Sequence, residues 1–216
     1  MGKVVGNARR LLGEDVLRHG TFVHAHGSST PQNRVTESHI YQQLASAFKL
    51  ENWPVTAVKA YVGHSLSAAS ADQLSATLGT WAEGFIPGIK TTHKIADDVH
   101  QQQLEFVLQD KQIDPAELPV AFINAKGFGG NNASAMIISP AKTRQLIAQR
   151  YSASELSHYQ NRNETVAETA HRYDSDATAG TTRPRYHFGE SVLEPADLTI
   201  SDQEIRISGW DQAVPL

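Results

Sequence analysis

The chain contains no cysteine among its 216 residues, which excludes disulfide bonds, thiolate metal sites and thiol catalysis within this polypeptide. It has no basic excess either, since 19 Lys and Arg residues stand against 23 Asp and Glu residues. We therefore expect no nucleic-acid partner. No apolar run is long enough for a membrane span, and Met1–Gly6 lacks the apolar core of a signal peptide. A cytoplasmic protein is the expectation.

The apolar residues that are present, with 40% of the chain hydrophobic, follow alternating helical and strand-like patterns. Helices are predicted over residues 5–18, 35–49, 67–83 and 99–108, and strands over residues 21–25, 55–58, 120–123 and 133–138. Strands that alternate with helices are typical of layered α/β proteins. We predict a mixed sheet covered by helices.

The composition changes after about residue 140. Residues 141–172 are polar and compatible with helix, 175–183 read as a linker, and 198–207 alternate as a small hairpin does. The expected organisation is one domain over residues 1–139, followed by an extension over residues 140–216.

Three short segments combine reactive or charged groups with glycines and small residues: His26–Pro31, Lys59–His64 and Asn124–Asn132. Each of them follows a predicted strand, and ligand sites in α/β sheets favour the carboxyl ends of strands. Small residues let the backbone approach a substrate closely. The segments are therefore candidates for one functional site.

The two histidines suggest a specific chemistry. His26 and His64 can together hold a carbonyl oxygen as it becomes an enolate, and Lys59 adds positive charge nearby. The simpler alternatives are a strand-end histidine bonded to a carbonyl and a solvated lysine.

The glycine-rich segment offers amide donors. Gly127, Gly129 and Gly130 permit positive φ angles, so the loop can contribute to an oxyanion hole, with Phe128 as a gate. The alternative is a tight turn with Phe128 in the core. Nucleotide binding is disfavoured because the Gly-Lys-Ser/Thr ending of a phosphate loop is absent and a strand follows.

In order and composition the three segments resemble the His-Gly-Thr-x-Thr-Pro, Lys-x-x-x-Gly-His and Asn-x-x-Gly-Phe-Gly-Gly-x-Asn motifs of β-ketoacyl synthases. Residues from about 5 to 138 fit the second half of that family. The resemblance implies the carboxy-terminal half of a thiolase-like fold, in which two similar halves form a layered α/β/α/β/α core.

The resemblance also implies roles for individual residues. It makes His26, Lys59 and His64 the catalytic set, and Phe128 the gate whose amide joins the oxyanion hole. Glu37 is expected in the supporting network around Lys59 and His64. The remaining site residues are Gly127 and Gly129 beside the gate and Thr30 and Asn124 as supports.

The implied reaction is a decarboxylative Claisen condensation of a malonyl group on acyl carrier protein with an acyl thioester. The substrates are carried on phosphopantetheine, and neither a resident cofactor nor a metal is expected. Because this chain has no cysteine, the nucleophile is expected in an N-terminal half of the synthase. The complete enzyme is expected to be a homodimer.

Several positions depart from the family pattern and indicate a divergent branch. They are Ser28 for Thr, Arg34 for Asp, Gln73 for Glu, Lys126 for a frequent Phe, and Ser67 and Ser70 for glycines.

Three origins compete: a fragment of a synthase, a subunit of a split enzyme, and a non-catalytic half that binds carrier protein or a cysteine-bearing partner. We favour the fragment and expect an acyltransferase that is inactive as the isolated chain. A metal hydrolase is a further alternative, because His24 and His26 form a spaced pair to which His64, His93 and His100 can add ligands.

Overall fold

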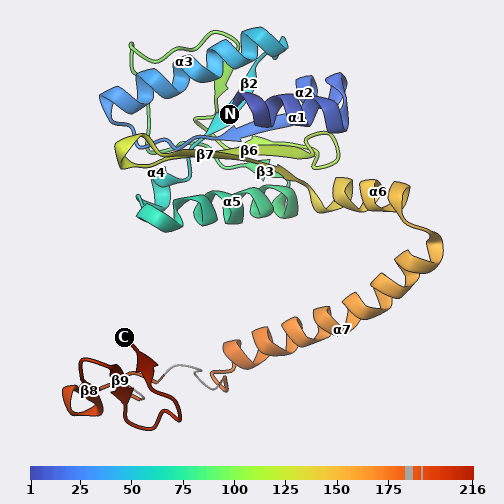
Figure 1. Cartoon of the computed structure of the whole chain (residues 1–216). Coiled ribbons are helices and arrows are strands. Elements are labelled where there is room, and N and C mark those ends of the chain that lie inside the picture. Colours follow the sequence, from blue (N-terminus) through green and yellow to red (C-terminus); the bar gives the residue numbers. More distant parts are fainter. Residues whose placement is uncertain (183–186, 191) are drawn as a thin grey trace. The chain divides into compact units, whose positions relative to one another are not determined.

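The computed structural model describes residues 1–182, 187–190 and 192–216, which form two units, Met1–Ser152 and Ala153–Leu216 (Figure 1). The first unit includes α6 (Pro140–Arg150), so it extends beyond the boundary expected between residues 139 and 140. Among the described helices, none is long and apolar enough to cross a membrane.

The first unit is built on a five-stranded sheet in the order β4-β2-β1-β6-β7. Strand β1 runs parallel to β2 and β6, β2 runs parallel to β4, and β7 is antiparallel to β6. The predicted mixed sheet is confirmed. The strands are β1 (Thr21–His24), β2 (Trp53–Thr56), β4 (Leu104–Phe106), β6 (Val120–Lys126) and β7 (Asn132–Ile138).

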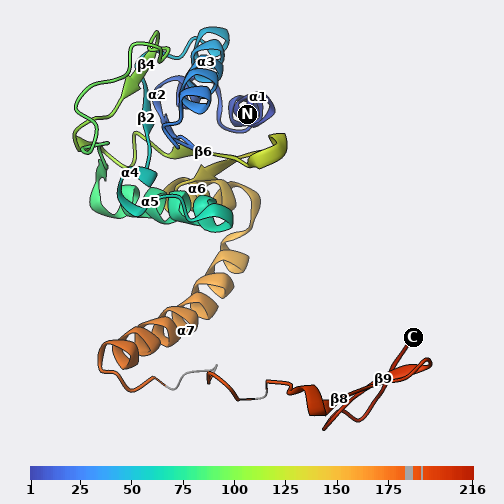
Figure 2. The same ribbon diagram turned by 90° about the vertical axis from the view of Figure 1, so that its left-hand side faces the viewer.

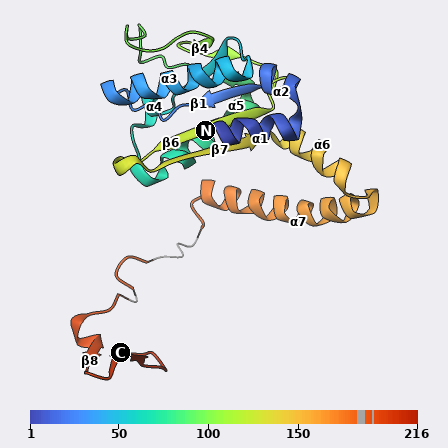
Figure 3. The ribbon, with the colours of Figure 1, turned by 45° about the horizontal axis from the view of Figure 1, so that its top comes forward.

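Helices cover both faces of this sheet (Figures 1 and 2). One face carries α1 (Gly2–Leu12), α2 (Glu14–His19) and α3 (Pro31–Phe48), and the other carries α5 (Ala69–Glu83). Figure 3 shows α1 alongside β7, and α3 contacts β4 near the opposite edge. The predicted covering of the sheet by helices is therefore confirmed.

Side chains alternate along β1 and contribute to a hydrophobic core on each face of the sheet. Val23 packs with Tyr41 and Trp53 beneath α3, whereas Phe22 packs with Trp81 of α5. Successive strand residues point to opposite faces, so a strand buried on both sides is apolar at consecutive positions.

The predicted helix over residues 5–18 is two helices. Gly13 separates α1 from α2 with a φ of 93°, a conformation that favours glycine. The predicted helix over residues 67–83 begins as a 3₁₀ turn, η1 (Leu66–Ala68), before α5.

The predicted helix over residues 99–108 is wrong. Leu104–Phe106 forms β4 and pairs with Trp53–Val55 of β2. The pairing buries Leu104 while Glu105 forms an ion pair with Lys111, so sheet pairing overrides the helical spacing of the apolar residues. Beside it, β3 (Phe85–Ile86) and β5 (Lys111–Gln112) form a separate two-stranded ribbon.

The second unit contains α7 (Ala153–Thr178) and a three-stranded sheet of β8 (Leu198–Ile200), β9 (Glu204–Ile207) and β10 (Val214–Pro215), preceded by the 3₁₀ turn η3 (Pro195–Asp197). The antiparallel pairing of β8 with β9 confirms the predicted hairpin. The linker predicted from residue 175 is wrong up to Thr178, because α7 continues that far. The last residue of the predicted linker, Arg183, lies outside the described residues.

Candidate active site

The three sequence segments meet at one edge of the sheet. His26 comes two residues after β1, Lys59 follows β2, and Gly127 follows β6 directly. Because β1 runs parallel to β2 and β6, the carboxyl ends of all three strands lie at the same edge. This shared direction explains why residues about 100 positions apart form one site.

A cavity of about 1080 Å³ opens at this edge. Seven of the expected site residues line it, whereas Asn124 and Gly129 do not: the lining set is His26, Lys59, His64, Thr30, Glu37, Gly127 and Phe128. Its apolar wall includes Ile89, Val99 and Phe106. A cavity of this size with a few convergent polar groups is suited to a small-molecule substrate.

The imidazole of His26 has a defined tautomer. Its Nδ1 accepts a hydrogen bond from the backbone N–H of Lys126 at 3.2 Å and lies 3.5 Å from Nζ of Lys59. A neutral imidazole that accepts at Nδ1 carries its proton on Nε2. Burial and the charge of Lys59 lower the pKa of His26 below its ordinary 6.5, outweighing the opposing charge of Glu37. His26 is therefore a neutral Nε2–H donor at neutral pH.

His64 is held in a similar way. Its Nδ1 accepts a hydrogen bond from the backbone N–H of Leu66 at 3.0 Å, which places its proton on Nε2 as well. The rings of His26 and His64 lie edge to face, with centroids 5.0 Å apart. Two imidazole donors thus flank one part of the cavity.

Lys59 is the first residue of the short helix α4 (Lys59–Val62). Burial lowers the pKa of Lys59 below its ordinary 10.5, while the charges of Glu37 and Asp72 oppose that shift. Its position 3.5 Å from Nδ1 of His26 brings positive charge to the histidine pair.

Glu37 is a buried carboxylate surrounded by hydrogen-bond donors, here called the Glu37 network. It accepts from the backbone N–H groups of His26 and Gly27 at 2.8 and 3.0 Å. It also accepts from Asn33 at 3.0 Å, the Tyr41 hydroxyl at 2.6 Å and Asn124 at 2.8 Å. The expected network was one around Lys59 and His64, whereas these hydrogen bonds fix the backbone of His26.

Two members of the Glu37 network, Asn33 and Tyr41, are absent from the sequence-based site. They lie four residues before and after Glu37 on α3, so helical spacing is the signal that identifies them. Burial and the neighbouring carboxylate raise the pKa of Tyr41 well above its ordinary 10, which keeps the hydroxyl protonated as a donor.

Asn124 and Gln73 connect the network to β6 and α5. The side-chain oxygen of Asn124 accepts from Ser134 at 2.8 Å. The amide nitrogen of Gln73 donates to the carbonyl oxygens of Ala25 and Asn124 at 2.8 and 3.0 Å. Gln73, noted as a departure in the sequence, thus ties β1 to β6 behind His26.

The glycine loop is a strand-to-strand connection. Gly127 N–H donates to the carbonyl of Asn131 at 2.6 Å, and Gly129 has a φ of 80°. The ring of Phe128 is 92% exposed, so the alternative with Phe128 in the core is wrong. Thr30, by contrast, is the N-cap residue of α3, directly before Pro31 at the first helical position.

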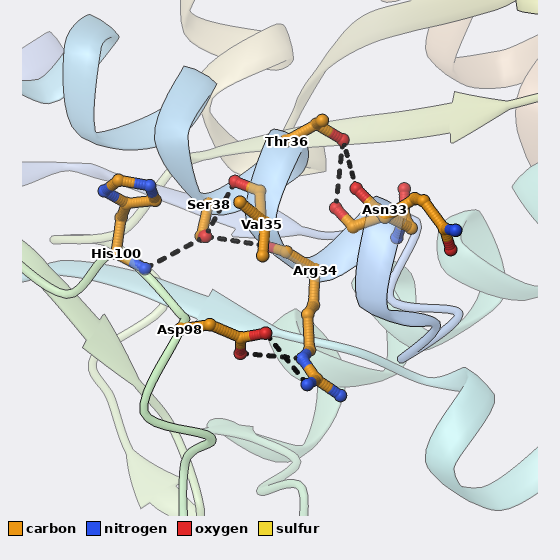
Figure 4. A network of polar contacts seen from close by, with 8 residues as sticks. Asn33, Arg34, Val35, Thr36, Ser38, Asp98 and His100 are labelled. Atoms are coloured by element: carbon orange, nitrogen blue, oxygen red, sulfur yellow. Dashed lines mark hydrogen bonds and ion pairs between the residues drawn. The ribbon is translucent and has the colours of Figure 1, made fainter.

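Arg34, another departure, pairs with Asp98 through two hydrogen bonds of 2.8 and 2.9 Å (Figure 4). Ser38 adds a second link, since its hydroxyl accepts from the backbone N–H of His100 at 3.1 Å. The Arg34 hydrogen bonds lower the pKa of Asp98. These contacts attach to α3 the segment that carries Val99, which is part of the apolar wall of the cavity.

The histidines proposed for a metal site do not form a ligand cluster. Within the described part of the chain, no group of three or more His, Cys, Asp or Glu residues is placed to hold a metal ion. His24 lies in the core beside Phe22, with ring centroids 5.5 Å apart, on the α5 side of the sheet.

Comparisons with known proteins show which family the chain resembles. Residues 20–93 match the family described as Beta-ketoacyl synthase, C-terminal domain. The Beta-ketoacyl-[acyl-carrier-protein] synthase FabY of Pseudomonas aeruginosa is 46% identical over 212 residues, 98% of this chain and 33% of its own length. The 3-oxoacyl-[acyl-carrier-protein] synthase 2 of Synechocystis sp. is 31% identical over 114 residues, 53% of this chain and 26% of that protein.

The comparison of structures also finds a ketosynthase. The crystal structure of the noncanonical ketosynthase FabY from P. aeruginosa matches with a TM-score of 0.81 over 100% of this chain and 34% of that one. The predicted thiolase-like architecture is confirmed by this match. The chain spans about a third of the length of that relative. By motif, sequence and fold, residues 20–93 carry the carboxy-terminal domain of β-ketoacyl synthases, and the chain as a whole is similar to a third of the ketosynthase FabY.

Proposed function

We propose that this chain supplies the histidine–lysine–histidine centre of a β-ketoacyl-[acyl carrier protein] synthase, an acyltransferase. One observation carries the proposal. Both His26 and His64 have Nδ1 occupied by a backbone N–H, which leaves two Nε2–H donors in one cavity. Paired neutral donors suit an oxygen that gains negative charge during a reaction.

The reaction begins with a malonyl thioester on acyl carrier protein. The bond between the carboxylate carbon and the α-carbon breaks, carbon dioxide leaves, and the electron pair forms an enolate. The thioester oxygen then carries the negative charge and accepts hydrogen bonds from His26 and His64. Loss of carbon dioxide generates the nucleophile, so the proposed step uses no metal and no cofactor beyond the phosphopantetheine that carries the substrate.

The enolate carbon attacks an acyl group held as a thioester on a cysteine, and the cysteine thiolate leaves. The tetrahedral oxyanion accepts from the backbone N–H of Phe128 and from the amide of that cysteine. The exposed ring of Phe128 lies beside the flexible Gly127 and Gly129, which suits a gate at the cavity. Burial and, next to it, the charge of Lys59 lower the pKa of His26, and Lys59 adds positive charge beside the developing anion.

The cysteine comes from another part of the synthase, because this chain contains none. Helix α5 and the preceding turn η1 offer a surface for that part, since Leu66 of η1 and Leu74 and Leu78 of α5 are 67%, 37% and 47% exposed. An exposed apolar stripe marks an interaction surface. We infer that the isolated chain is inactive, that the complete enzyme is a cytoplasmic homodimer, and that acyl carrier protein is its partner.

Complementation tests the proposal. The chain is mixed with, or fused to, the cysteine-bearing part of the FabY relative, and carbon dioxide release from malonyl-carrier protein and the β-ketoacyl product are measured. We expect activity only in the combined enzyme. His26→Ala should abolish it, whereas His19→Ala, a change at an exposed histidine on α2, should not.

The outcomes separate the alternatives. Condensation by the isolated chain would contradict the need for an external cysteine. A combined enzyme that is equally active with His26→Ala would favour the non-catalytic binding subunit instead. Leu74→Glu together with Leu78→Glu should prevent complementation, whereas Leu11→Glu on α1, also at an exposed leucine, should leave it intact.

A further inference from the structure

Lys126, the last residue of β6, contacts the site through both its backbone and its side chain. Its N–H donates to Nδ1 of His26 at 3.2 Å, and its Nζ donates to the hydroxyl of Thr36 at 3.0 Å. Lys126 and Thr36 line the same cavity as Lys59. The side chain therefore places a second positive charge at the substrate cavity.

Among the described residues, no carboxylate forms an ion pair with Lys126. Arg34 and Lys94 also line the cavity, but each pairs with an acid, Asp98 at 2.8 Å and Asp97 at 2.9 Å. Over the described ranges, no carboxylate lies within ion-pair distance of Lys126 or Lys59. A cation that lines a concave site without a counter-ion is free to bind an anionic group of a ligand.

We propose that Lys126, whose Nζ is positioned by its hydrogen bond to the Thr36 hydroxyl, binds the free carboxylate of the malonyl thioester and so selects a carboxylated substrate. This assignment rests on the proposed function. When His26 and His64 bind the thioester oxygen, the carboxylate is the charged group at the reacting end of the substrate. Lys126 ends β6, the strand beside β1, and lines the same cavity as His26 and His64, so its charge and the histidine donors face one substrate.

The reaction decides how Lys126 contributes. When carbon dioxide leaves, the negative charge moves from the carboxylate to the thioester oxygen. A cation on the carboxylate therefore stabilises the bound substrate more than the transition state of decarboxylation. Lys126 gives affinity and selectivity for the malonyl group, whereas the histidines stabilise the product of decarboxylation.

A phosphate has the same attraction for a lysine, and the phosphopantetheine arm carries one. NMR titrations of the isotope-labelled chain with three probes separate the two sources. The probes are the malonyl and acetyl thioesters of N-acetylcysteamine, which contain no phosphate, and phosphopantetheine, which contains no malonyl carboxylate.

Lys126→Met is the test variant, because the backbone N–H that holds His26 remains. We expect about ten-fold weaker binding of the malonyl thioester and unchanged binding of the acetyl thioester. Lys126→Arg should retain the malonyl affinity. Lys3→Met, a change at an exposed lysine of α1, is the matched control and should have no effect.

Each other outcome contradicts the assignment. Unchanged malonyl binding, or equal weakening for both thioesters, refutes the carboxylate role of Lys126. Weakening confined to phosphopantetheine moves the role to the phosphate. If the wild-type chain binds neither thioester near His26, the proposed function fails and this assignment fails with it.

Discussion

His24 makes the stability of the first unit depend on pH in a defined direction. The ring is fully buried beside Phe22, and burial lowers its pKa from 6.5 to about 4. The unfolded chain therefore binds a proton between these two pH values while the folded chain does not. Stability contributed by the neutral ring is complete above pH 6.5 and is lost progressively as the pH falls toward 4.

The magnitude follows from the two pKa values. A difference of about 2.5 units, at about 1.36 kcal/mol per unit, corresponds to about 3 kcal/mol over the whole window. Between pH 7.5 and pH 5 about 2 kcal/mol of this should be lost. That is a large part of the stability of an ordinary domain.

Urea unfolding at a series of pH values measures the effect. Trp81 is a suitable fluorescence reporter, because its ring packs 6.4 Å from that of Phe22, which contacts His24. Trp210 lies in the second unit and is replaced by Phe, so that the signal comes from the first unit.

His24→Leu removes the titrating group and should flatten the profile by about 2 kcal/mol between pH 7.5 and pH 5. At pH 7.5 the variant should be at least as stable as wild type, because neither ring nitrogen of His24 has a hydrogen-bond partner among the described residues. Parallel profiles for wild type and His24→Leu would refute the reasoning.

Two further predictions concern the support of His26. Glu37→Gln should lower the free energy of unfolding by about 3 kcal/mol, because an amide NH₂ replaces an oxygen that faces N–H and O–H donors. Asn33→Ala, which leaves the carboxylate intact, should cost only about 1 kcal/mol, and equal losses in urea unfolding would contradict this account. Gly27→Ala should destabilise by about 2 kcal/mol and shift the NMR signals of the His26 ring, because φ is 56° and a Cβ would lie 2.5 Å from that of Ala57. Unchanged stability and unchanged ring signals would show that this close approach is relieved.

The sequence was sufficient to predict the site where a local pattern and a general rule coincide. His26, Lys59 and the glycine loop each follow a strand, and parallel strands end at the same edge. The helix predicted over residues 99–108 failed because its apolar spacing is local, whereas β4 exists through pairing with β2, about 50 residues earlier. Sequence spacing carries no information about that partner.

The Glu37 network shows a similar division. Tyr41 and Asn33 are found by helical spacing, but Asn124 reaches Glu37 from 87 residues away. The donor to Nδ1 of His26 is a backbone N–H 100 residues along the chain. A backbone group carries no residue-specific signal, so the tautomer of His26 follows only from the fold.

The contacts that orient His26 and His64 show which part of the protein positions the histidine pair. The backbone of His26 is fixed by Glu37, its Nδ1 by Lys126, and the ring of His64 by the N–H of Leu66. All of these groups belong to the first unit of this chain. In the proposed reaction, a cysteine supplied from elsewhere would therefore join donors that are already oriented, and the carbanion-forming half would depend on this unit for its geometry. Decarboxylation and acyl transfer should accordingly be separable by mutation, the first through His26 and the second through the external cysteine.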